Sequence, residues 1–561
     1  MKRIILLVLS LLIVGLIKNN INIVYADDDP NENYLRFTVT EGEGATLTLK
    51  KVGNVSSLDD NALFYSIVSN GLFGEWNEVV FNESECLISG LNYNDNVCFK
   101  RDDSGTFSFS SENAYYTFAS SEGSTIEVSG DVTTLINGNG NVSDLSVNNN
   151  LNYCFNSLFK DSNFKFNNLV LPSTQLSAGC YYRMFEDCEN LQNAPELPAT
   201  TMKTYCYAYM FDGCSNLTTP PELPALDLAP FCYRGMFAAF TKPNGITTAP
   251  ELPATTLESY CYSQMFASSQ QDGSIITVGP KLPATTLAPY CYEEMFACVN
   301  SSGNSVVPNA NNLKIAPDLP ATSLDEACYH EMFAGCQKLE IAPELPATNL
   351  VPFCYNEMFK YCTSLKVPPE LPIASLSNMC CVQMFANSGI SISDTSSEPH
   401  TIFYRIPSGE NTISSYDETY MSQMFYGCSS SSTLVNGTPS VSGSSISLYL
   451  KNVPLTISFD GNGDNVSNVP TAQSKQPFEE ITLPTASSIS KSGYTLKGWS
   501  LRQDGKDNFY LPGASVKARG DMKFYAIWEE NNNDNDDENP SSPSSEDSTS
   551  NRHIVLNTSV N

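Results

Sequence analysis

Seven positions in a recurring Pro-x-Leu-Pro motif could bind cations. Each charged residue precedes a leucine, and neighbouring residues of an extended segment face opposite sides, so the leucine points inward and the charge outward. If the segments stack as parallel strands about 4.8 Å apart, the charges form a stripe on the concave face. The positions are Glu196, Glu222, Glu251, Lys281, Asp318, Glu344 and Glu370.

This predicted stripe is anionic, because six of its seven residues are acidic. One hypothesis is that it recruits a basic partner or a divalent cation. The alternative is that a solvated position is often Glu in so acidic a chain, which has 61 acidic residues, 30 basic residues and a formal net charge of −31. A field of that sign repels phosphate backbones, so we expect no nucleic-acid partner.

Catalytic residues are harder to find. The three histidines, His330, His400 and His553, are scattered, which disfavours zinc hydrolysis and most Ser or Cys triads. A glycosidase would need one singular carboxylate pair, whereas the carboxylates here recur once per repeat. We therefore predict no enzyme, no catalytic residues, no resident metal and no cofactor.

The elements that position the stripe belong to a sequence repeat with a base period of 26 residues. In residues 180–191, the apolar residues are spaced 1, 3, 1, 3 and 3 apart, which predicts a helix of about three turns with one buried face. Prolines flank the other half of the unit and leave a short extended piece. A short parallel strand plus a helix per coil predicts an α/β leucine-rich-repeat solenoid over residues 151–440, of about ten units. The repeats align on Met184, Met210, Met236, Met265, Met295, Met332, Met358, Met384 and Met424, with Leu158 one unit earlier.

The chain has 18 cysteines, 16 of them in the repeats. Cysteines eight residues apart on a helix are separated by about 12 Å, which is too far for a disulfide. We predict that these cysteines are small buried apolar residues. The sequence leaves open whether Cys86 and Cys98, which lie outside the repeats, are bridged.

The repeat motif resembles that of a known family. Cys-x-x-Leu, a short piece ending in Leu-Pro, and then Met-Phe-x-x-Cys look like the BspA-like, or treponemal, leucine-rich repeat of bacterial surface proteins. Cys-Tyr and Met-Phe stand here where that family carries Ile-Gly and Ala-Phe. The resemblance implies an exported adhesin-like or scaffold protein.

A second resemblance covers about 75 residues near the C-terminus. The order Phe-Asp-x-Asn-Gly, Leu-Pro, Gly-Tyr-Thr-x-x-Gly-Trp and Phe-Tyr-Ala-x-Trp, from Phe459 to Trp528, is similar to the Listeria–Bacteroides repeat, the B-repeat of internalins. It implies a small β-grasp-like domain over residues 453–530, used as a spacer or adhesive unit on cell-surface proteins. Trp499 and Trp528 are expected in its core.

The ends of the chain predict its location. Lys2 and Arg3 precede an apolar run over residues 4–17, and small residues precede an acidic start after Ala26. This pattern predicts a signal peptide over residues 1–26; an uncleaved anchor is the alternative. Alternating runs in residues 27–150 predict an all-β, sandwich-like domain that could cap the repeats. The composition of residues 531–561, rich in Asn, Asp, Glu, Ser and Pro, predicts a disordered acidic tail.

These patterns together predict a secreted or cell-surface protein with no transmembrane helix after signal removal. Its expected function is cell adhesion or scaffolding, through binding of a protein or glycan on another cell or matrix. The alternatives are an extracellular carbohydrate-active enzyme and a purely structural surface-layer component. The sequence does not disclose the ligand, the mode of surface attachment or the oligomeric state.

Overall fold

The computed structural model describes most of the chain between residues 33 and 531. The predicted signal peptide and residues 532–561 of the predicted tail lie outside the described residues. No helix among the described residues is long and apolar enough to cross a membrane. The described ranges are 33–53, 63–101, 112–146, 151–271, 273–274, 276–298, 310–393, 400–405, 420–428, 434–435, 438–439, 447–451, 453–506 and 508–531.

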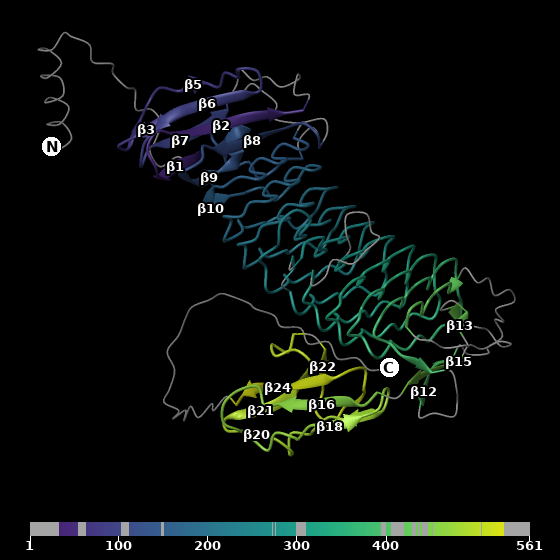
Figure 1. Ribbon diagram of the computed structural model, residues 1–561. Helices are drawn as coiled ribbons and strands as arrows, with labels where there is room; N and C mark the ends of the chain where they lie inside the picture. Colours follow the sequence, from purple (N-terminus) through teal and green to yellow (C-terminus); the bar gives the residue numbers. More distant parts are fainter. Residues whose placement is uncertain are drawn as a thin grey trace, which may run out of the picture.

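Two β-sheets form the N-terminal region (Figure 1). One sheet has the order β10-β9-β1-β7-β3-β4, with β5 paired to β3, and the other has the order β6-β2-β8. Alternating residues such as Leu35, Phe37 and Val39 of β1 are buried, as expected for strands with one face on a core. The strands are β1 (Leu35–Glu41), β2 (Ala45–Val52), β3 (Leu63–Ser69), β4 (Leu72–Phe73), β5 (Asn77–Glu78), β6 (Glu85–Leu91), β7 (Asn96–Arg101), β8 (Tyr115–Ser120), β9 (Thr125–Asp131) and β10 (Lys165–Val170).

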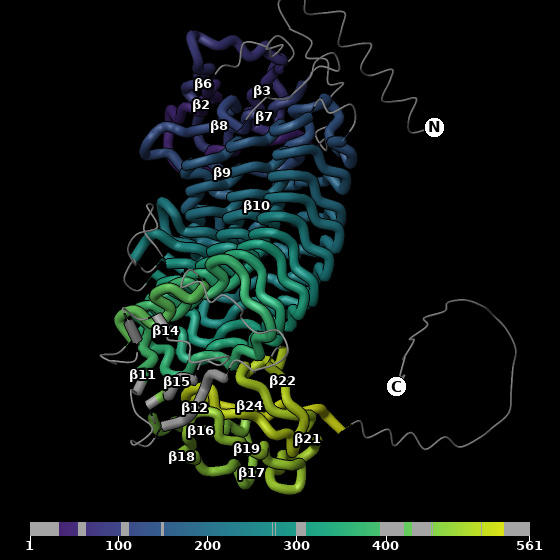
Figure 2. Tube along the Cα trace, turned by 90° about the vertical axis from the view of Figure 1, so that its right-hand side faces the viewer, coloured from purple at the N-terminus to yellow at the C-terminus, as the bar shows by residue number. Residues whose placement is uncertain are grey.

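The repeats form stacked coils made of turns (Figure 2). Within a coil, every second N–H closes a turn: Tyr182 donates to the carbonyl of Gly179 over 3.0 Å. The intervening N–H groups donate to the next coil, as Tyr181 does to the carbonyl of Cys206 over 3.0 Å. Half of these donors are therefore satisfied only when the neighbouring coil is present.

Every fourth residue of these turn segments has a positive φ. In one coil these residues are Gly179, Arg183 and Asp187, and in the next they begin with Tyr205 and Tyr209. A positive φ costs conformational free energy in every residue except glycine. The contacts between stacked coils must offset that cost. The resulting period is four residues.

The predicted α/β leucine-rich-repeat solenoid with one helix per coil is therefore wrong. The described residues are nearly all β or turn, and the helical element that is described in full is the 3-10 segment η2 (Val132–Leu135). Apolar spacings of 1 and 3 fit a period of four as well as one of 3.6 over so short a segment. Hydrogen bonds to the neighbouring coil, which sequence spacing does not reveal, decide between the two.

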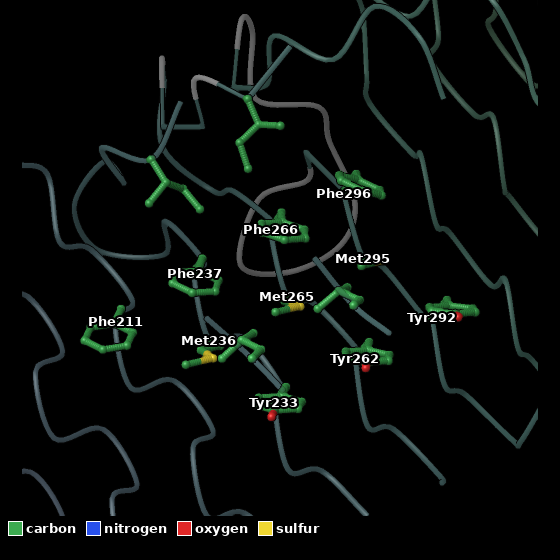
Figure 3. Packing of buried hydrophobic residues seen from close by; sticks show 14 of the residues in the cluster. Phe211, Tyr233, Met236, Phe237, Tyr262, Met265, Phe266, Tyr292, Met295 and Phe296 are labelled. Carbon is green, nitrogen blue, oxygen red and sulfur yellow. The ribbon is translucent and has the colours of Figure 1, made fainter. Parts of the chain in front are cut away.

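Aromatic rings fill the interior of the stack in columns (Figure 3). Phe211, Phe237 and Phe266 stack with ring centroids 5.8 and 5.9 Å apart and planes within 10°. A parallel column joins Tyr233 to Tyr262 over 5.8 Å. Stacking of equivalent rings fixes the register of one coil on the next, because a shifted coil would lose every ring contact in its column.

The N-terminal sheets cover the first coil. Phe118 of β8 donates its N–H to the carbonyl of Leu158 over 2.9 Å and stacks on Phe159 with centroids 6.2 Å apart. Strand β10 pairs in parallel with β9. These contacts close the end of the stack that would otherwise expose apolar surface.

The C-terminal module, residues 453–530, is a mixed sheet of order β17-β20-β21-β24-β16-β18 with β22 on β21, plus a two-stranded sheet β19-β23. No helix packs on it among its described residues, so the β-grasp-like expectation is not met. Trp499 is buried and Trp528 is half-buried. Its strands are β16 (Leu455–Asp460), β17 (Val466–Ser467), β18 (Gln473–Lys475), β19 (Glu480–Thr482), β20 (Ser490–Lys491), β21 (Tyr494–Ser500), β22 (Phe509–Tyr510), β23 (Ser515–Lys517) and β24 (Met522–Glu530).

Short strands lie on both sides of the last described turn segment, residues 420–428. Strands β12 and β11 pair on either side of β15, and β13 pairs with β14. Strands β11 and β12 precede the last repeat, which aligns on Met424, whereas β13, β14 and β15 follow it. Their bounds are β11 (Ile392–Ser393), β12 (His400–Arg405), β13 (Leu434–Val435), β14 (Thr438–Pro439) and β15 (Ser447–Lys451).

Candidate functional site

The charged positions of the Pro-x-Leu-Pro segments lie on the outside of the coils, as the alternation predicts. Glu196 is exposed, whereas the adjacent Leu197 and the next inward residue, Ala199, are buried. The segments are extended but form no strand ladder; isolated parallel bridges such as Asn193 to Thr219 flank them. Prolines remove the N–H donors that a longer ladder would need.

The C-terminal module lies against this acidic stripe. Lys506 Nζ is 2.9 Å from Glu251 Oε1, and Lys517 Nζ is 2.6 Å from Glu370 Oε2. A third contact, Arg519 Nη1 to Glu344 Oε1, is 3.7 Å long. Three stripe carboxylates thus hold cationic side chains that are at least 147 residues away in sequence.

Arg519 is the buried centre of this contact. Its Nη1 donates to the carbonyl of Ala342 over 3.4 Å, and its Nη2 donates to the hydroxyl of Tyr510 over 3.0 Å. Burial raises the pKa of Tyr510, and the nearby carboxylates of Asp318 and Glu344 raise it further. Asp318 therefore also belongs to the electrostatic surroundings of the module.

The basic position of the stripe meets a different partner. Arg502 donates from Nη1 to the carbonyl of Gly279 over 3.1 Å, two residues before Lys281. Arg502 has its own carboxylate, Asp504, at 2.9 Å. Near Lys281 the module thus places Arg502, whose charge Asp504 already balances. Near the stripe glutamates it places Lys506 and Lys517, which pair with Glu251 and Glu370.

A reversed ion pair lies at the same contact. Lys366 of the coils is 3.1 Å from Asp521 of the module, and both side chains are half-exposed. Exposed pairs of this kind contribute about 0.2–1 kcal/mol each, and salt screens them. Four ion pairs join the module to the coils, three of them between half-exposed or exposed side chains and one, Arg519 to Glu344, with a buried guanidinium.

A cavity of about 550 Å³ lies between the module and the coils. Its walls are two Pro-x-Leu-Pro segments, including Glu344 and Glu370, and the module residues Phe478, Lys517 and Arg519. The two surfaces therefore do not pack directly against each other at this cavity, although one buried apolar cluster includes residues of both the coils and the module.

The N-terminal end of the stripe is not covered by the module. Among the described residues, no ion pair involves Glu196 or Glu222, and both are exposed. A second cavity, of about 510 Å³, lies beside Glu196 and is lined by Phe166, Asn167 and Asn193 among others. This end leaves carboxylates accessible to an external partner.

The structure also reveals an acidic cluster that the sequence reasoning missed. His330 lies between Glu293 and Glu331, at 3.7 and 3.5 Å. The pKa of Glu331 is raised to about 7, chiefly by burial and also by the nearby Glu357 and Glu294, while His330 lowers it. Burial alone would lower the pKa of His330, but the facing glutamates raise it. Among the described residues, no His, Cys, Asp and Glu group could hold a metal ion.

All 18 cysteines are free and buried, which confirms the prediction for the repeats. Cys86 lies in β6 and Cys98 in β7, and these strands belong to different sheets. They are not bridged. Burial raises the pKa of most repeat thiols, for example that of Cys206 to about 12.

Comparison with known proteins identifies one part of the chain. Residues 456–527 match the Listeria–Bacteroides repeat domain. A "Putative Gly-rich membrane protein" of Evansella cellulosilytica is 32% identical over 76 residues, which is 13% of this chain and 9% of that protein. The chain thus covers only a small part of this relative. No solved structure matches the chain.

Proposed function

We propose that the chain is an exported bacterial cell-surface protein that binds a macromolecular partner, as an adhesin or a scaffold. The partner is a protein or glycan on another cell or matrix, and it binds to the face of the coils that carries the acidic stripe. Listeria–Bacteroides repeats occur in surface proteins, which supports a location at the cell surface.

One observation carries the proposal: the stripe already binds cations of protein origin. Glu251, Glu344 and Glu370 hold two lysines and an arginine of the C-terminal module. The same outward carboxylates recur at Glu196 and Glu222, where the module does not reach. A basic partner therefore finds, at the open end, the chemistry that holds the module at the other end.

The runner-up functions are a structural surface-layer component and a carbohydrate-active enzyme. A structural component needs no accessible stripe, so changing the open carboxylates would leave its interactions unaltered. An enzyme needs a singular reactive cluster, whereas these carboxylates recur coil after coil.

The test uses the full chain and a labelled deca-lysine peptide. We expect the pair Glu196→Gln and Glu222→Gln to weaken binding of the peptide and to flatten its salt dependence. The control pair, Glu75→Gln and Glu258→Gln, changes the net charge equally at exposed residues outside the stripe and should keep most of the affinity. If both pairs of substitutions lowered the affinity for the peptide equally, net charge alone would explain the binding. That result would refute the proposal.

A further inference from the structure

The module and the external partner need the same kind of site. The cationic groups on the module reach the stripe over its C-terminal part, from Glu251 to Glu370. A basic partner that follows the stripe from its open end would meet Lys506 of the module at Glu251. Both cannot hold that carboxylate at the same short distance.

We infer that the C-terminal module is an internal ligand of the acidic stripe, and that a basic partner must displace it to occupy the whole stripe. This inference rests on the proposed function and adds a closed state to it. In the closed state, the stripe glutamates that the partner's cationic groups would bind are paired with Lys506, Lys517 and Arg519 of the module.

Two features of the contact suit a latch. The pairs Lys506 to Glu251 and Lys517 to Glu370 are about half-exposed at every side chain, so salt and competing cations reach them. The gap of about 550 Å³ between the surfaces means that opening does not expose a fully packed core at that place. Opening would also separate the buried Arg519 from the carbonyl of Ala342, to which its Nη1 donates over 3.4 Å.

The open end of the stripe provides the starting point for exchange. Glu196 and Glu222 are exposed in the closed state, so a partner can bind there first and then replace the module one coil at a time. The closed state lowers the apparent affinity in proportion to the fraction of molecules that are open. Weakening the latch should therefore raise the affinity for a basic partner.

The experiment compares Lys517→Glu with Lys497→Glu in the full chain. Both change the net charge by the same amount, and Lys497 is an exposed module residue for which the structure records no ion pair with the coils. Small-angle scattering should show expansion for Lys517→Glu only. The double variant Lys517→Glu with Glu370→Lys restores an opposite pair and should return to the compact dimensions.

Binding of the labelled deca-lysine peptide to the same variants gives the second readout. We expect roughly tenfold tighter binding for Lys517→Glu than for Lys497→Glu. Lys506→Glu, at the other end of the contact, should behave like Lys517→Glu.

The outcomes separate the inference from the proposed function. Failure of Lys517→Glu to expand, or expansion with an affinity equal to that of Lys497→Glu, overturns the inference while the proposed function stands. Absence of peptide binding to every variant, the expanded ones included, overturns both.

Discussion

Single buried groups show how strongly the stack excludes water. The thiols form rows along the coils, and burial raises the pKa of Cys154 above that of a free thiol, as it does for most of its neighbours. A thiol reacts as its thiolate, so the thiols whose pKa is raised are unreactive while the coils are stacked; the hydrogen bond with Cys381 lowers the pKa of Cys380 instead. Their role is to fill space.

We expect almost none of the 18 thiols to react with a disulfide reagent at pH 8 in the native protein. All 18 should react after denaturation in guanidinium without reductant. The measurement is a thiol titration of both states with mass spectrometry of the modified peptides. A shortfall in the denatured count would reveal disulfides and contradict the structure.

Asp212 is a buried carboxyl group whose ionisation opposes folding. Its pKa is raised from 3.8 to about 7, chiefly by burial and also by the nearby Glu186 and Asp187, while the hydrogen bond from the N–H of Phe240 lowers it. The folded state therefore holds a proton that the unfolded state releases above about pH 4. Stability due to this group is greatest below pH 4 and falls as the pH rises to about 7.

Asp212→Asn should remove this pH dependence. The wild-type chain should lose at most about 4 kcal/mol relative to the variant between pH 4 and pH 8, since one pKa unit corresponds to about 1.4 kcal/mol. The check is the difference between the urea-unfolding curves of the two proteins at both pH values. A difference that does not change with pH would show that Asp212 ionises freely in the folded state.

At the scale of the element, the turn segment differs from a helix in the sign of φ at every fourth residue. Ala327 has a φ of 51°, whereas Ala334 of the same coil has no positive φ. Both are buried. The left-handed region costs a residue with a Cβ about 1–2 kcal/mol, and glycine removes that cost.

The free energy of unfolding of Ala327→Gly should therefore be at least about 1 kcal/mol larger than that of Ala334→Gly. In both variants glycine makes the unfolded chain more flexible and so destabilises the fold, but only at position 327 does it also remove the cost of a positive φ. The free energies of unfolding in urea give the comparison. If both substitutions destabilise the protein equally, as in a helix, the turn structure of the coils is wrong.

Spacing in the sequence predicts which side chains are buried better than it predicts the backbone. Leu197 and Met184 are buried and Glu196 is exposed, as expected, because alternation and recurrence report on which side faces the core. The helix prediction fails because bonds between coils, such as Arg183 to Ala208, leave no local mark. The contact of Lys517 with the stripe is also invisible, since no local pattern links residues 147 positions apart.

At the scale of the whole molecule, one buried apolar cluster runs from Leu35 of β1 through the coils to Ala526 of β24. The column of phenylalanines continues from Phe118 of the N-terminal sheets into Phe159 and Phe185 of the coils. The N-terminal region and the coils should therefore unfold together.

Phe159→Ala should break this coupling, since removing a buried phenylalanine ring costs about 3–5 kcal/mol. We expect calorimetry to resolve two transitions where the wild type has one. Phe266→Ala, in the middle of the stack, removes the same ring and should leave the N-terminal sheets coupled to the first coil. A single transition in Phe159→Ala would mean that the N-terminal region is held by other contacts.

The account depends most on the module's being seated on the acidic stripe, and a zero-length carbodiimide cross-linker tests this directly. It joins a lysine to a carboxylate only when the two are in contact. We predict intramolecular cross-links between Lys517 and Glu370 and between Lys506 and Glu251, both lost at about 1 M salt, where the screening length is about 3 Å. The local pairs Lys475 to Glu479 and Lys360 to Glu357, at 2.7 and 2.6 Å, are the internal controls. Cross-links at the control pairs alone, at low salt, would contradict the account.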